Sequence, residues 1–128
     1  MITDVPNEQV NLGDVLRLAL PLKTDVIGGA RNTRRGINWA IVLAGWSDLG
    51  PQVLPGDLVL VPPHLQAGLN TADLREKLES LAALNAVGAI LFQEVTESLR
   101  DPELYGDMSL LIVPDDRTVR EIQQSITS

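Results

Sequence analysis

The chain has 128 residues, of which 45% are hydrophobic, and it contains no cysteine. This length fits one compact domain, and the aliphatic content supplies enough apolar surface to offset the entropy cost of ordering the chain. The missing cysteines exclude disulfide scaffolds, thiol catalysis and cysteine-ligated zinc sites. A net charge of −7 argues against direct nucleic-acid contact by this chain. Because it has no apolar run of roughly 18 residues and no signal-peptide pattern, we expect a cytoplasmic protein that does not enter a membrane.

The first part of the chain predicts one short helix and two strands. Residues 1–9 form a loose lead-in, after which Asn11 caps a short helix that Pro21 stops. A strand over residues 25–27 ends at a pair of glycines. The run rich in β-branched residues at 37–44 predicts the second strand.

A loop and a buried strand follow. Residues 45–56 contain three glycines and two prolines and predict a loop, which ends in a turn at residues 54–57. The wholly apolar run at 58–61 is typical of a strand that is covered on both faces. The proline pair at 62–63 ends this strand.

The second half of the chain alternates helices with apolar strands. Uncharged runs at 87–92 and 110–113 predict two more strands. Thr71 caps a helix before them, and Asp115 or Asp116 caps a last helix after them. The inward apolar positions of these helices are Leu74, Leu78, Leu81 and Ala82 in the first and Val119, Ile122 and Ile126 in the second.

This alternation predicts an α/β fold. Strands that alternate with helices pair in parallel, so we expect a single domain over residues 1–128 with a central, mostly parallel sheet flanked by helices. The centre of the sheet falls within residues 57–126. The polar stretch at 94–105 adds a short helix between two of its strands, while the order of the strands does not follow from the sequence.

Polar residues follow three of the predicted strands and form the first candidate site. Ligands of open parallel sheets bind outside the carboxyl ends of the strands, where His64, Glu94 and Asp115 are expected. A histidine with carboxylates could hold a metal ion or act as an acid–base pair. The alternative is that loops at strand ends are simply polar, since carboxylates there mostly cap helices. For a bound ligand these residues are the candidates, and we expect no catalytic residue, metal or cofactor.

A glycine- and arginine-rich segment at residues 28–36 forms the second candidate. Arg31, Arg34 and Arg35 could bind an anion, because guanidinium groups and flexible backbone amides suit phosphate or carboxylate. The segment fits neither the phosphate-binding loop of nucleotide hydrolases nor the dinucleotide fingerprint. The alternative is a hairpin-like connection that its arginines keep soluble. No serine stands in a Gly-x-Ser-x-Gly pattern either, and we do not expect an enzyme.

Four segments, in order, carry a resemblance to a known family. Residues 10–16, followed by Leu20-Pro21, look like the pattern T-V-x-D-L-L … L-P, and residues 26–29 look like V-V-A-G. Residues 34–40 are similar to R-x-V-x-W-V, and residues 54–60 to L-x-G-G-E-L-V-L. Together they resemble the N-terminal domain of PucR-type purine-catabolism transcriptional regulators, over nearly the whole chain. The family's following Thr-Thr-Gly is replaced here by Val61-Pro62-Pro63.

The resemblance implies a non-catalytic regulatory domain. Such a domain would sense a small metabolite of purine or nitrogen catabolism and signal to a DNA-binding helix-turn-helix region, which nothing in this chain supplies. We also expect a homo-oligomer, most simply a dimer. One alternative is a homodimerising interaction module without a ligand, which the aliphatic residues and the tryptophans Trp39 and Trp46 within 37–61 would support. A small acid–base or metal-dependent enzyme built on His64 is a further alternative.

Overall fold

The computed structural model describes residues 11–15, 20–21, 23–28, 36–114 and 118–127. They form a five-stranded sheet in the order β1-β5-β4-β3-β2, in which β1 is antiparallel to β5 and the other pairs are parallel. The predicted mostly parallel α/β fold is therefore confirmed. The strands are β1 (Asp25–Ile27), β2 (Ala40–Val42), β3 (Leu58–Val61), β4 (Gly88–Leu91) and β5 (Ser109–Ile112).

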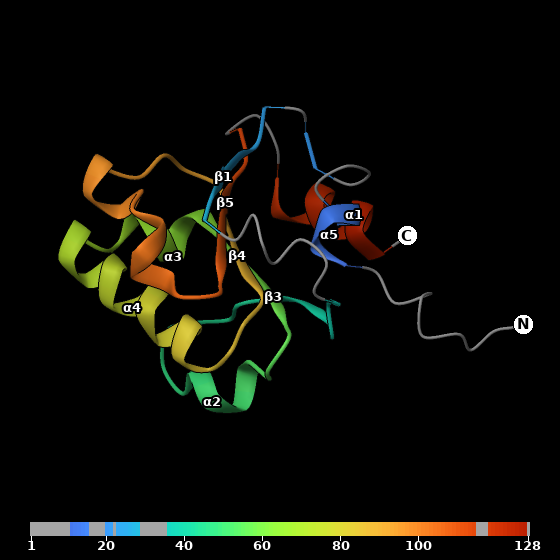
Figure 1. The fold of residues 1–128 in the computed structure, drawn as a ribbon, viewed down its shortest axis with the longest axis horizontal. Coiled ribbons are helices and arrows are strands. Elements are labelled where there is room, and N and C mark those ends of the chain that lie inside the picture. Colours follow the sequence, from blue (N-terminus) through green and yellow to red (C-terminus); the bar gives the residue numbers. More distant parts are fainter. Residues whose placement is uncertain (1–10, 16–19, 22, 29–35, 115–117, 128) are drawn as a thin grey trace, which may run out of the picture.

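Helices cover both faces of the sheet. Figure 1 shows α2, α3 and α4 on one side of it and α1 and α5 on the other. Consecutive strands from β2 to β5 are neighbours, as expected of crossover connections that pack against one face. The helical elements are α1 (Leu12–Asp14), α2 (Leu49–Gln52), α3 (Pro63–Ala67), α4 (Thr71–Ala83), η4 (Glu97–Leu99), η5 (Pro102–Tyr105) and α5 (Val119–Thr127), where η marks a 3₁₀ helix.

The three central strands β3, β4 and β5 are buried along their whole length. Because successive side chains of a strand point to opposite faces, each strand contributes to two separate hydrophobic clusters. Leu78 and Leu81 of α4 complete the cluster on one face, and Leu12 of α1 and Ile122 of α5 complete the other. Ser109 is the one polar residue in these three strands, and their otherwise uncharged, apolar sequences follow from this double coverage.

The predicted turn at residues 54–57 is confirmed and leads into β3. The Asp57 amide donates to the Leu54 carbonyl (3.0 Å), with Pro55 at the second position and Gly56 at the third. Gly56 has a φ of 88°, the value that a type II turn requires there and that favours glycine. The buried Asp57 carboxylate accepts hydrogen bonds from the Leu54 amide (2.9 Å) and the Asn38 side chain (3.1 Å). It thereby ties the turn to the chain that enters β2.

We expect Asp57→Ala to lower the free energy of unfolding by about 2 kcal/mol, because it leaves two donors without their charged acceptor. Chemical denaturation followed by circular dichroism measures this cost. Glu76→Ala is the control, since it removes a carboxylate from an exposed position in the interior of helix α4 (Thr71–Ala83). Equal stabilities of the two variants would contradict the role given to Asp57.

Both second-half caps lie elsewhere than predicted. The side chain of Asn70, not that of Thr71, accepts the capping bond from the Asp73 amide (2.8 Å), and Thr71 is the first residue of α4. Thr118 caps α5, because its side chain accepts from the Glu121 amide (3.1 Å) and Glu121 accepts from the Thr118 amide (2.9 Å). This reciprocal pair satisfies two donors at once. The predicted caps at 115–116 lie outside the described residues.

Two predicted irregular segments contain helices, and one predicted strand is shorter. The loop at 45–56 holds α2, and the residues after β3 form α3, in which the fixed φ of Pro63 suits the first helical position. The strand predicted at 37–44 spans only Ala40–Val42. Asn11 caps the N-terminal helix as predicted, and Asp14 returns a hydrogen bond to the Asn11 amide, which completes a capping box.

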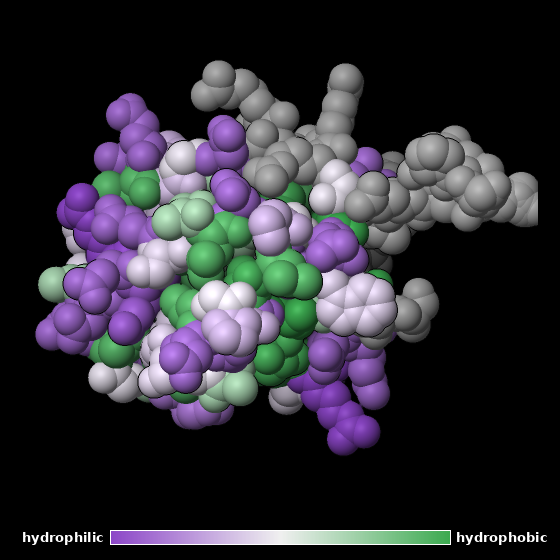
Figure 2. Space-filling view, turned by 90° about the horizontal axis from the view of Figure 1, so that it is seen from below, coloured by the Kyte–Doolittle hydropathy of each residue, from purple (hydrophilic) through white to green (hydrophobic). Residues whose placement is uncertain are grey.

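The face of the molecule on the α2 side carries an apolar surface. Figure 2 views this face, where hydrophobic side chains gather near the centre. Trp39, at the start of β2, is 70% exposed, and Leu54 is 56% exposed. Among the described residues, no helix is long and apolar enough to cross a membrane.

Candidate ligand-binding site

A pocket of about 670 Å³ opens at the carboxyl ends of the parallel strands. The residues just after β4 and β5 meet the beginning of β1 there, because β1 runs antiparallel to β5 and pairs Asp25 with Ile112. This is the position at which open α/β sheets bind ligands. We call it the carboxyl-edge pocket; its lining residues are Lys23, Asp25, Pro63, Phe92, Gln93, Glu94, Ile112, Val113 and Pro114.

The floor of the carboxyl-edge pocket is apolar. Phe92, Ile112 and Val113 are buried side chains of the sheet and its extensions, and Pro63 of α3 and Pro114 flank them. The Val113 amide donates to the Leu91 carbonyl (3.0 Å), so the chain continues the β4–β5 pairing into the pocket. Such a floor suits the apolar body of a small organic molecule.

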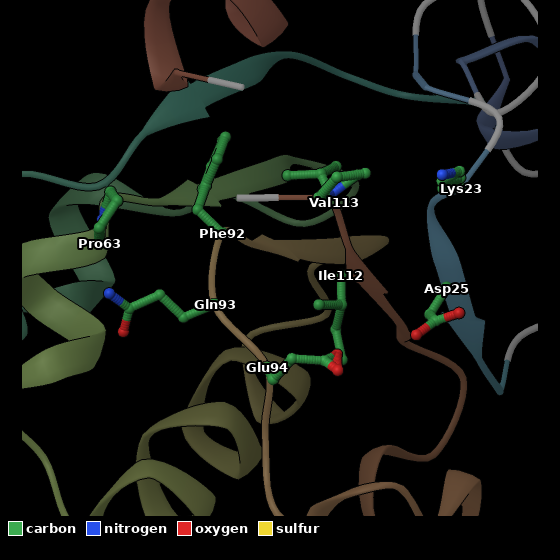
Figure 3. A pocket seen from close by; sticks show the side chains of 9 residues that line it. Lys23, Asp25, Pro63, Phe92, Gln93, Glu94, Ile112 and Val113 are labelled. Atoms are coloured by element: carbon green, nitrogen blue, oxygen red, sulfur yellow. The ribbon is translucent and has the colours of Figure 1, made fainter. Parts of the chain in front are cut away.

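The rim carries charged groups from two sides of the sheet. In Figure 3, Ile112 lies between Glu94, which follows β4, and Asp25 of β1. Arg100 stands beside both carboxylates: its guanidinium lies 3.2 Å from Asp25 Oδ2 and 4.0 Å from Glu94 Oε1. All three side chains are partly or largely exposed, so these ion pairs are solvated and add little to stability. They are therefore available to exchange partners with a ligand.

A buried glutamine holds one wall of the carboxyl-edge pocket. The Gln66 side chain of α3 donates from Nε2 to the Gln93 carbonyl (2.8 Å), which fixes the segment that leaves β4. Gln66 is 4% exposed, and its Oε1 atom is buried with no hydrogen-bond partner among the described residues. A buried acceptor without a donor costs about 1–3 kcal/mol.

Of the two predicted site residues that the structure describes, His64 and Glu94, one lines the pocket. Glu94 does so, at the predicted strand end. His64 is exposed on α3 and is not among the lining residues, although its neighbour Pro63 is. That His64 and Glu94 share one site stays a prediction, and in the structure His64 lies on α3, which Pro63 begins. Arg31, Arg34, Arg35 and Asp115 lie outside the described residues.

Several lining residues were missed by the sequence reasoning. Lys23 and Asp25 reach the pocket only because β1 pairs with β5, which brings together segments more than eighty positions apart in the sequence. Nothing in the local pattern signals that pairing. Gln93 could have been found, since it directly follows the predicted strand that Glu94 also follows.

The rim of the carboxyl-edge pocket combines charged and hydrogen-bonding groups. It offers carboxylate acceptors at Asp25 and Glu94, an amide at Gln93 and a cation at Lys23, above an apolar floor. Among the described residues, no group of three or more His, Cys, Asp or Glu side chains is arranged to hold a metal ion. The arrangement thus suits a small polar molecule with an apolar body.

Three comparisons with known proteins were negative. A scan against protein-family models, a search of curated proteins and a search of solved structures each found no match to this chain.

Proposed function

We propose that this chain is a regulatory domain that binds a small metabolite in the carboxyl-edge pocket. The observation that carries the proposal is the placement of the pocket: an apolar floor and a charged rim meet at the sheet edge where α/β domains bind ligands. The resemblance to the PucR N-terminal domain points to the same class of function. Intermediates of purine or nitrogen catabolism are the first ligands to test.

The rim suggests how binding could be passed on. Arg100 is held between Asp25 of β1 and Glu94 after β4, so a ligand that contacts either carboxylate competes with this arginine. Binding would then favour one arrangement of β1 and the 94–100 segment over another. A ligand can shift such an equilibrium only by its difference in affinity for the two states. The receiver of the signal would be a DNA-binding region of the regulator.

A thermal-shift screen of purines and their breakdown products, followed by calorimetry, tests ligand binding. A bound compound stabilises the folded state by mass action, by about 2.7 kcal/mol at a concentration a hundred times its Kd. If no compound raises the melting temperature at millimolar concentration, metabolite sensing is contradicted.

For any compound that binds, we expect Glu94→Ala to weaken binding about tenfold, because a charge-assisted hydrogen bond contributes on the order of 1.4 kcal/mol. Glu97→Ala is the matched control, since it removes the same charge from an exposed residue three positions along that does not line the pocket. Equal affinities of the two variants would place the ligand elsewhere.

A further inference from the structure

Strand β2 forms one edge of the sheet, and its outer side is unpaired among the described residues. The Trp39 carbonyl accepts from the Leu58 amide (2.8 Å), and the Leu43 amide donates to the Leu60 carbonyl (2.9 Å). Backbone groups of a strand alternate in direction, so the odd-numbered residues of this segment face β3. Ala40 and Val42 therefore direct their N–H and C=O groups away from the sheet.

The chain itself limits how far this free edge extends. The amide of Ala44 donates to Gln52 Oε1 (3.0 Å), and Gln52 Nε2 donates to the carbonyls of Gly45 (3.2 Å) and Ser47 (2.8 Å). The side chain of Gln52 thus occupies the position that a neighbouring strand would need beyond Val42. Within the part of the chain that the structure describes, four backbone groups, two each on Ala40 and Val42, have no partner strand.

The free edge is apolar and uncharged. Residues 36–47 contain no Asp, Glu, Lys or Arg. Trp39 stands at one end of the edge with most of its surface exposed. Protein edges are commonly protected from pairing by lysine, proline or a bulge, and β2 has no such residue. None of these features therefore prevents another strand from pairing with β2.

We propose that β2 pairs antiparallel with β2 of a second copy of this chain, so that the two sheets become one. A two-fold axis at Ile41 sets Ala40 of each copy opposite Val42 of the other. In this register all four free backbone groups of each strand are used, in two pairs that exchange both hydrogen bonds. The interface is isologous, as in most homodimers.

The charge pattern favours a second copy as the occupant. A strand that pairs with itself across a two-fold axis brings the residue on the axis opposite its own equivalent and the adjacent residues near theirs, so like charges at these positions would repel. β2 meets this condition because it is uncharged, whereas the opposite edge strand, β1, carries Asp25. The carboxyl-edge pocket lies at the ends of β1, β4 and β5, so pairing at β2 leaves it open. The dimer is therefore independent of the proposed ligand.

Sedimentation equilibrium over a wide range of protein concentration tests this dimer. We expect a reversible monomer–dimer equilibrium, with the amides of Ala40 and Val42 protected from hydrogen exchange only where the dimer forms. Trp39→Lys changes an exposed side chain beside the edge, and Val42→Pro removes an N–H that makes no bond to β3. Each should raise the dimer dissociation constant by about tenfold or more.

The matched control places the same lysine on the other edge of the sheet. Val26 of β1 is 44% exposed, and Val26→Lys should leave the dissociation constant unchanged. Circular dichroism shows whether each variant keeps the fold, and Trp39→Lys serves if Val42→Pro does not. A chain that stays monomeric at the highest concentration overturns the proposal, as does a dimer that survives every folded β2 variant or that Val26→Lys disrupts.

Discussion

Ile90→Ala is expected to lower the free energy of unfolding by about 2–5 kcal/mol, the range for truncating a fully buried aliphatic side chain. Ile90 lies in β4, the central strand, between Leu60 of β3 and Leu111 of β5. All three side chains belong to the cluster that α1 and α5 cover, and all have no exposed surface. Because the neighbouring strands are fixed by the sheet, the space left by the lost atoms can close only partly.

The control for this prediction is Ile90→Val, which removes a single methyl group and should cost about 0.5–1.5 kcal/mol. Urea or guanidinium denaturation measures both variants, and an unchanged slope with denaturant shows that they unfold as the parent does. If alanine costs no more than valine, the cluster relaxes into the space and is less tightly packed than we describe.

The same burial explains why the central sheet could be predicted from the sequence. Strands β3, β4 and β5 are covered on both faces, so their sequences are short apolar runs bounded by polar residues, glycine or proline. The turn at 54–57 was equally predictable, because Pro55 and Gly56 occupy the two central positions that a type II turn assigns to them. In these segments local preference and tertiary packing agree.

Elsewhere the tertiary structure decides between several acceptable local outcomes. Asn70 and Thr71 are both good capping residues, and only the backbone path shows that Asn70 holds the position. The β-branched run at 37–44 is a strand only where it pairs with β3, because it lies at the edge and Gln52 takes the amide of Ala44. Local propensity alone predicts neither which residue caps α4 nor where β2 ends.

Those residues of the candidate site that come directly after a strand could be predicted from the sequence. Glu94 directly extends the chain beyond β4, so the position of the strand places it in the carboxyl-edge pocket. Asp25 depends on a strand pairing distant in sequence, and Arg100 on the path of the chain through η4. Strand order and loop path are set by the packing of the whole domain, and a single sequence does not state them.

The second large predicted effect is a loss of folding stability in alkaline solution, caused by Tyr105. Its side chain is buried at the end of η5, where the hydroxyl donates a hydrogen bond to the Leu99 carbonyl. Burial raises the pKa of Tyr105 to about 12, helped by the carboxylates of Glu79 and Asp101 and opposed by Arg75. In the unfolded chain the pKa returns to about 10. It is the one tyrosine in the chain, so its ionisation can be followed by near-ultraviolet absorbance.

The sign of the effect follows from these two pKa values. Below about pH 10 the tyrosine is protonated in both states, and its contribution to stability is fully present. Between about pH 10 and pH 12 only the unfolded chain loses the proton, so stability falls, by about 2–3 kcal/mol in total at 1.36 kcal/mol per pKa unit. Above the folded pKa the loss is complete.

Tyr105→Phe isolates this contribution from the lysines that titrate in the same range. At neutral pH we expect the variant to be about 1 kcal/mol less stable, because the hydrogen bond to the Leu99 carbonyl is lost. It cannot ionise, so the difference should shrink above about pH 10 and reverse at about pH 11, beyond which the variant is the more stable protein. Denaturation of both proteins across this range tests the reversal. A constant difference would mean that the hydroxyl ionises as readily in the folded protein as in the unfolded one, and that η5 does not bury it.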